Sequence, residues 1–99
     1  MEIEIHRYDC QKVEEFADAH GLKMVVRERG ANHHPSVRFY ASFEGIEAKD
    51  GCILSGPFGN GATPEEAIAN YLPVISKRTL VYHAYREDRR VFDAPILVV

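Results

Sequence analysis

The sequence predicts a two-layer α/β domain of the α+β kind, in which two helices cover one face of an antiparallel sheet. Apolar and polar residues alternate along several short stretches, as they do in strands that bury one face. Two other stretches, residues 9–21 and 63–75, space their apolar residues for one face of a helix and carry helix start and stop signals. The predicted order is β-α-β-β-β-α with one or two strands appended, in a single domain of 99 residues.

The N-terminal part of the chain predicts a strand followed by a helix. Residues 1–5 alternate apolar residues with two glutamates, which indicates a half-buried strand. Asp9 is a suitable N-cap for the helix, and Gly21 is suitable for its left-handed end. The apolar face of this helix consists of Val13, Phe16, Ala17 and His20, and the opposite, acidic face carries Glu14, Glu15 and Asp18.

Three further strands are expected before the second helix. Residues 22–29 and residues 37–43 both alternate with period two, and residues 30–35 between them have the composition of a turn. Residues 49–51 form a tight-turn signal that leads into residues 52–56 as a fourth strand. These last two strands are therefore expected to form a hairpin.

The second helix has a complete start signal. Thr63 is a suitable N-cap, Pro64 fits the first helical position, and Glu66 completes a capping box. Pro73 removes one helical hydrogen bond, so the helix is expected to kink or stop near it. The buried face is expected to comprise Ala67, Ile68, Tyr71, Leu72 and Ile75.

After this helix the chain reads as two strands, residues 79–85 and residues 91–99, separated by a charged turn at residues 86–90. Pro95 makes the last run an edge strand or an extended tail.

Residues 10–76 resemble the double-stranded-RNA-binding domain in more than the order of their elements. The turn Gly30-Ala31-Asn32-His33-His34-Pro35 keeps the glycine, histidine and final proline of that family's first loop. The helix start at residues 59–68 keeps both glycines, the hydroxyl residue and the buried alanine. The resemblance implies a core at residues 10–76 and a C-terminal strand extension at residues 77–99.

The residues that hold RNA in this family are replaced. Pro64, Glu65 and Ile68 stand where the family has three phosphate-binding lysines, and the first helix presents an acidic face. Binding of nucleic acid is therefore disfavoured, although the fold is retained.

Two further resemblances bear on function. Residues 43–72 are similar to the hairpin and helix of HicB-type antitoxins, including a G-x-T-x-E-E-A helix start. The whole chain resembles small proteins encoded by bacteriophages and prophages. This resemblance implies a non-enzymatic intracellular interaction module, encoded by a phage, that binds and inhibits a host protein. The alternatives are a nucleic-acid-binding module that uses residues 30–35 and a basic sheet face, and a HicB-like binder.

The sequence offers no recognisable catalytic or metal-binding constellation. Cys10 and Cys52 have no zinc-ligand spacing and are interpreted as reduced thiols, with Cys52 buried on a short strand. His33 and His34 are adjacent turn residues that point apart. We therefore expect no enzyme, cofactor or metal. No apolar run approaches the length of roughly 20 residues that spans a membrane, so we expect a soluble, cytoplasmic protein.

The positive charges are segregated, although the formal net charge is −3. Lys23, Arg27 and Arg29 share one strand face, which the helices are expected to leave open, and a second basic cluster lies between positions 77 and 90. Such a face either keeps the protein soluble or docks an acidic protein, a nucleic acid or a second copy of the chain. The candidate binding residues are Lys23, Arg27, Arg29, His33, Arg38, Tyr40, Arg86, Arg89 and Arg90.

The C-terminal strands suggest a second surface. Residues 79–85 carry apolar side chains on both faces, so Val81 and Tyr85 would form an exposed apolar strip unless the tail or a partner covers them. The sequence therefore predicts a homodimer or a partner complex built on residues 79–97.

Overall fold

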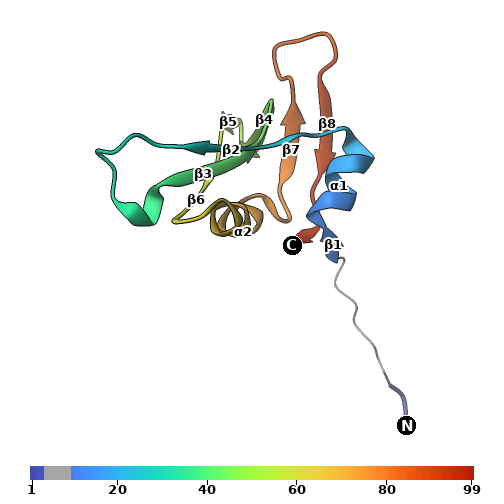
Figure 1. The fold of residues 1–99 in the computed structure, drawn as a ribbon. Helices are drawn as coiled ribbons and strands as arrows, with labels where there is room; N and C mark the ends of the chain where they lie inside the picture. Colours follow the sequence, from blue (N-terminus) through green and yellow to red (C-terminus); the bar gives the residue numbers. More distant parts are fainter. Residues whose placement is uncertain (4–9) are drawn as a thin grey trace.

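The computed structural model describes residues 1–3 and 10–99, and it confirms the α+β class. Figure 1 shows two helices, α1 (Val13–His20) and α2 (Pro64–Ile75), among short strands. The strands of the described residues are β1 (Cys10–Lys12), β2 (Met24–Glu28), β3 (Phe39–Phe43), β4 (Ile46–Asp50), β5 (Ile53–Ser55), β6 (Gly59–Gly61), β7 (Thr79–Tyr82), β8 (Arg90–Asp93) and β9 (Ile96–Val98). A single 3₁₀ turn, η1 (Pro35–Val37), precedes β3.

The strands form two antiparallel sheets and one parallel pair. One sheet has the order β2-β3-β6, and the other has the order β5-β4-β7-β8. The pair β1-β9 is parallel and joins the two ends of the described fold, with Gln11 opposite Leu97. No helix of the described residues is long and apolar enough to cross a membrane.

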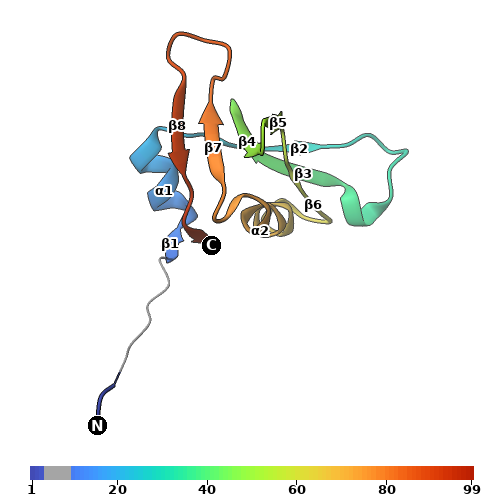
Figure 2. The ribbon, with the colours of Figure 1, turned by 180° about the vertical axis from the view of Figure 1, so that it is seen from behind.

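Helix α2 packs directly on the β2-β3-β6 sheet, as both views of the ribbon show (Figures 1 and 2). Gly59 and Gly61 permit this contact, because a Cβ atom at either position would overlap the helix backbone at Tyr71 or Ala67. Gly59 and Gly61 are therefore close-packing residues. They lie in a strand, however, rather than in a turn.

Both helices contribute to one hydrophobic core. Phe16 of α1 lies with its ring centroid 6.1 Å from that of Phe43 on β3 and 5.9 Å from that of Phe92 on β8. Tyr71 of α2 is fully buried, and its hydroxyl accepts a hydrogen bond of 3.2 Å from the Phe43 N–H. Burial raises the pKa of Tyr71 above 10.0, and the Phe43 hydrogen bond opposes that shift.

The predicted start of the N-terminal region is partly wrong. Residues 1–3 belong to no strand, and the remainder of the predicted first strand and the Asp9 cap fall outside the described residues. Helix α1 begins at Val13, and its N-cap, Lys12, makes no side-chain capping bond. Pairing with β9 holds residues 10–12 extended, which delays the helix. The predicted end is confirmed, since Gly21 has φ 64°.

Five strands, not three, separate the helices. The turn at Gly45, with φ 75°, sends the chain from β3 into the second sheet as β4. The predicted fourth strand is confirmed as β5, but the hairpin at Gly51 joins it to β4 and not to β3. Cys52 lies in this turn and is exposed, so its predicted burial is wrong; Cys10 is also exposed, and both thiols are free.

The predicted N-cap of α2 is confirmed, but among the described residues the Glu66 side chain does not return a bond to the Thr63 N–H, so the capping box is only half formed. Thr63 Oγ1 accepts a hydrogen bond of 3.2 Å from the Glu66 N–H. The helix ends at Ile75, two residues after Pro73, as expected from the proline. Ser76 then links the helix end to β9, because its hydroxyl donates to the Leu72 carbonyl at 2.7 Å and accepts from the Leu97 N–H at 3.0 Å.

Candidate functional site

The register of β2 and β3 separates two faces of their sheet. Met24 and Val26 lie opposite Phe43 and Ala41, on the side covered by α2. Arg27 lies opposite Tyr40 on the other side. Backbone bonds from Glu44 to Lys23 and from Arg29 to Arg38 continue this pairing at both ends, so the alternation places Lys23 and Arg29 with Arg27. The open face of the sheet comprises Lys23, Val25, Arg27, Arg29, Tyr40, Ser42 and Asn60.

Arg29 is the centre of an ordered cluster at one end of the open face. Its Nη1 donates to the Val37 carbonyl at 2.7 Å and to Asn60 Oδ1 at 2.5 Å. Its guanidinium carbon lies 4.5 Å from the Tyr40 ring centroid and 5.6 Å from that of Phe58. Tyr40 and Phe58 meet edge to face, and Phe58 keeps 47% of its surface exposed. We call Arg29, Tyr40, Phe58 and Asn60 the arginine–aromatic cluster.

The other basic candidates of this region have different surroundings. Lys23 and Arg27 are exposed, and among the described residues their side chains make no hydrogen bond or ion pair. Arg38 instead donates from Nε and Nη2 to Glu28 Oε1, at 2.9 and 2.7 Å. Glu28 lies opposite Phe39, on the α2 side of the register. The structure therefore does not bring Arg38 together with Tyr40.

His33 is exposed in the segment between β2 and η1, which extends away from the rest of the molecule (Figure 1). A shallow cavity of about 330 Å³ lies at this loop and is lined by Glu28, Arg29, Gly30, Ala31, His33, Pro35 and Arg38. His34 has a local role, since its Nδ1 accepts from the Ser36 N–H at 3.1 Å and begins η1.

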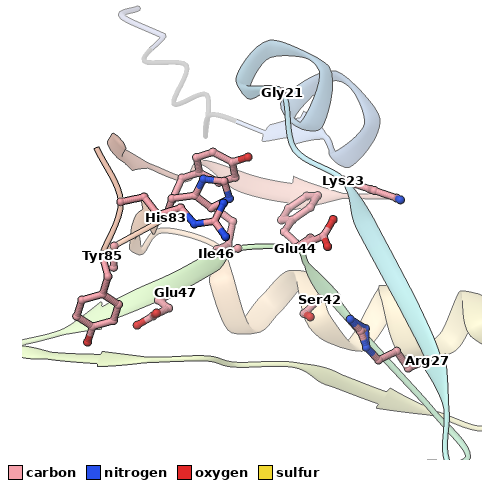
Figure 3. Close-up of a pocket in the computed structure, with 14 residues that line it drawn as sticks. Gly21, Lys23, Arg27, Ser42, Glu44, Ile46, Glu47, His83 and Tyr85 are labelled. Carbon is pink, nitrogen blue, oxygen red and sulfur yellow. The ribbon is translucent and has the colours of Figure 1, made fainter. Parts of the chain in front are cut away.

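A larger cavity of about 710 Å³ lies where the two sheets meet, and we call it the junction cavity (Figure 3). It is bounded by the end of α1, the β2 and β3 strands, the turn into β4, and the segment after β7. Its lining residues are Gly21, Lys23, Arg27, Ser42, Phe43, Glu44, Gly45, Ile46, Glu47, Tyr82, His83, Ala84, Tyr85 and Arg86.

His83 is held rigidly at the wall of this cavity. Its backbone has φ 50°, in the left-handed region, and its N–H donates to the Gly45 carbonyl at 3.0 Å. A Cβ atom at Gly45 would clash with the His83 ring, which stacks on Tyr82 at a centroid distance of 3.7 Å. The His83 Nδ1 lies 2.9 Å from Asp88 Oδ2, and this hydrogen bond holds the pKa of Asp88 below its ordinary value.

The three remaining candidate arginines do not form one patch. Arg86 lines the junction cavity, whereas Arg90 lies over the Tyr82 ring with its guanidinium carbon 4.5 Å from the centroid. Arg89 is exposed in the loop, and its N–H donates to the Arg86 carbonyl at 3.2 Å.

The sequence did not point to Phe58 and Asn60 of the arginine–aromatic cluster or to His83 of the junction cavity. One signal pointed to an exposed Phe58. Proline and glycine flank it, and this composition is typical of a turn, in which an aromatic side chain is rarely buried. The roles of Asn60 and His83 had no local signal, since each depends on a partner from a distant element. Among residues 1–3 and 10–99, no group of three or more His, Cys, Asp or Glu side chains is placed to hold a metal ion.

Comparison of the chain with known protein families, with curated proteins and with solved structures finds no match in any of the three. The resemblances to double-stranded-RNA-binding domains, to HicB-type antitoxins and to bacteriophage proteins therefore stay predictions.

Proposed function

We propose that this chain is a non-enzymatic interaction module that binds an acidic surface of a partner protein through its open face. The observation that carries this proposal is the arginine–aromatic cluster. Arginine and aromatic side chains dominate the energetics of protein interfaces, because they bury large areas and arginine adds several hydrogen-bond donors. Here Asn60 and the Val37 carbonyl already fix the Arg29 side chain, so less entropy is lost when a partner binds.

Charge indicates the chemistry of the partner. Lys23 and Arg27 extend the open face from the cluster, and neither charge is neutralised within the described part of the chain. A partner that brings carboxylates to this face would gain complementary contacts and faster association. The likeness to bacteriophage proteins supports a host protein as this partner, and inhibition of that protein as the outcome.

Duplex binding through residues 30–35 is the second candidate. The observation in its favour is the protruding loop with an exposed His33, beside Arg29 and Arg38. Three features disfavour it: Arg29 occupies a face of the Tyr40 ring, Glu28 neutralises Arg38, and acidic residues occupy the first turns of both helices.

Affinity capture from a bacterial lysate tests the proposal with two matched pairs of variants. Phe58→Ala should lose the captured protein, whereas Ile53→Ala, which also removes an exposed apolar side chain, should retain it. Arg27→Glu should lose it, whereas Lys49→Glu should not. Equal capture by all four variants would contradict the open face as the binding surface.

A salt titration with short RNA and DNA duplexes tests the second candidate. A duplex binder should lose affinity steeply as salt rises, because its binding releases condensed counterions. Absence of any retained duplex at about 50 mM salt would eliminate that candidate.

A further inference from the structure

The junction cavity holds charges of both signs that do not neutralise one another. Lys23, Arg27, Glu44 and Glu47 all line it, yet within the described residues none of these side chains makes a hydrogen bond or an ion pair. Glu44 lies next to Lys23, since its N–H donates to the Lys23 carbonyl at 2.9 Å, whereas Glu47 lies on β4. Such an arrangement suits a ligand that is anionic at one end and rich in N–H donors at the other.

Figure 3 shows how the two kinds of group are distributed. Lys23, which directly precedes β2, and Arg27 of β2 lie on one side of the cavity, whereas Glu47, His83 and Tyr85 lie on the opposite side. Phe43 and Ile46 also line the cavity, but both are buried and belong to the hydrophobic core. The volume of about 710 Å³ falls within the range of roughly 300–1,000 Å³ that is usual for small-molecule sites.

The side opposite β2 combines a free aromatic ring with hydrogen-bond acceptors. Tyr85 is 90% exposed, and its ring makes no aromatic or cation–π contact within the described residues, so a planar group can stack on it. Glu47 supplies a carboxylate that accepts N–H donors. His83 is held in place by Asp88, and its Nε2 edge lies against Gly45, which also lines the cavity.

We propose that the junction cavity binds a nucleoside monophosphate. The phosphate lies between Lys23 and Arg27, where an ammonium and a planar guanidinium fork provide the two usual kinds of phosphate contact. The base stacks on Tyr85 and donates its N–H groups to Glu47. This function goes beyond protein docking. It shares Lys23 and Arg27 with the open face, but it adds Tyr85 and Glu47, which take no part in the arginine–aromatic cluster.

Isothermal titration of the full chain tests the site with guanosine monophosphate, guanosine and inorganic phosphate as separate probes. Guanine offers adjacent N–H donors to a carboxylate, so the monophosphate should bind most tightly. Both Arg27→Gln and Glu47→Gln should weaken its binding at least about tenfold, the effect of one charged hydrogen bond. Lys49→Gln and Glu15→Gln are the matched controls outside the cavity and should leave binding unchanged.

Circular dichroism establishes that each variant is folded, and Lys23→Gln replaces Arg27→Gln if the latter does not fold. Absence of saturable binding of the monophosphate at millimolar concentration would overturn the proposal. Equal affinity for inorganic phosphate would overturn the two-ended site, as would a Glu47→Gln variant that binds normally. Capture of the protein partner by Phe58→Ala, or its loss, bears only on the docking proposal.

Discussion

The two antiparallel sheets meet the core in different ways. The β2-β3-β6 sheet presents Ala41, Gly59 and Gly61 to α2, so backbone packs almost directly on backbone. The β5-β4-β7-β8 sheet instead fills its core side with Ile46 and Leu80, as well as larger rings beside them. Backbone packing fixes the distance between α2 and the β2-β3-β6 sheet. The packing of the β5-β4-β7-β8 sheet depends instead on the volumes of its side chains.

This difference explains where the candidate sites lie. Asn60 sits between the two packed glycines and holds Arg29 on the open face, while its carbonyl accepts from Asn70 Nδ2 of α2 at 2.6 Å. A rigid support of this kind suits a preorganised docking surface. The junction cavity instead lies between the two sheets and includes the segment after β7, which projects from the fold (Figure 1).

Gly59→Ala is expected to have the largest effect on stability, and it tests the backbone packing of α2 on the first sheet. The added Cβ would overlap the backbone of Tyr71 and Ala67, and neither atom can move unless the helix leaves the sheet. We expect a loss of more than about 4 kcal/mol in unfolding free energy, or no folding at all. Urea denaturation measures this loss. Gly56→Ala is the control, because its Cβ would meet no atom within 4 Å, and equal stability of the two variants would contradict backbone packing.

Leu80→Ala tests the second sheet, where side-chain volume matters. Leu80 is fully buried between β4 and β8 and belongs to the common core. Its truncation should cost about 2–5 kcal/mol, depending on how far the surroundings collapse into the cavity. The same denaturation measurement applies. A cost below about 1 kcal/mol would mean that this sheet is not packed as described.

The comparison also explains how much the sequence could predict. Signals that act within one turn succeeded: Thr63 caps α2, and Gly21 ends α1 in the left-handed conformation. The prediction found the three-residue strand β5, because a turn signal precedes it, but missed β6, because alternation over Gly59–Gly61 gives no pattern and its pairing depends on β3. Within the candidate site, alternation placed Lys23, Arg27 and Arg29 on one face.

The remaining site features arise from tertiary contacts. The ion pair that removes Arg38 from the open face joins residues 10 apart in the chain, and Asn60 reaches Arg29 across 31 positions. Spacing along the sequence cannot reveal such neighbours.

Tyr71 links α2 to β3, so its titration reports on that contact. Because burial raises its pKa above 10.0, the folded state holds the phenolic proton more tightly than the unfolded chain does. This stabilisation is complete below the ordinary pKa and is lost as pH rises through the folded value. The unfolding free energy should therefore decrease above about pH 10.

Tyr71→Phe provides the control for this pH dependence. It removes the acceptor for the Phe43 N–H and should cost about 1 kcal/mol at neutral pH. It should also flatten the decline in stability above the pKa of tyrosine, as measured by thermal unfolding across a pH series. An unchanged decline would assign the effect to other groups.

The smallest effect on stability is expected at the outer side of the second sheet, where association rather than folding is in question. The sequence predicts that Val81 is exposed unless the tail or a partner covers it; it is fully buried with β8 paired beside it, so a charge there would unfold the domain and could not report on dimerisation. Tyr85 and Val91 remain 90% and 49% exposed, and they are the side chains of residues 79–97 that a second copy could cover.

If this region forms a homodimer, light scattering at micromolar concentration should give twice the chain mass. Val91→Glu should then reduce that mass to one chain while leaving the unfolding free energy of the monomer within about 0.5 kcal/mol of its original value. A monomeric mass for the unmodified chain, unaffected by Val91→Glu or Tyr85→Glu, would eliminate the homodimer and leave the apolar strip to a different protein.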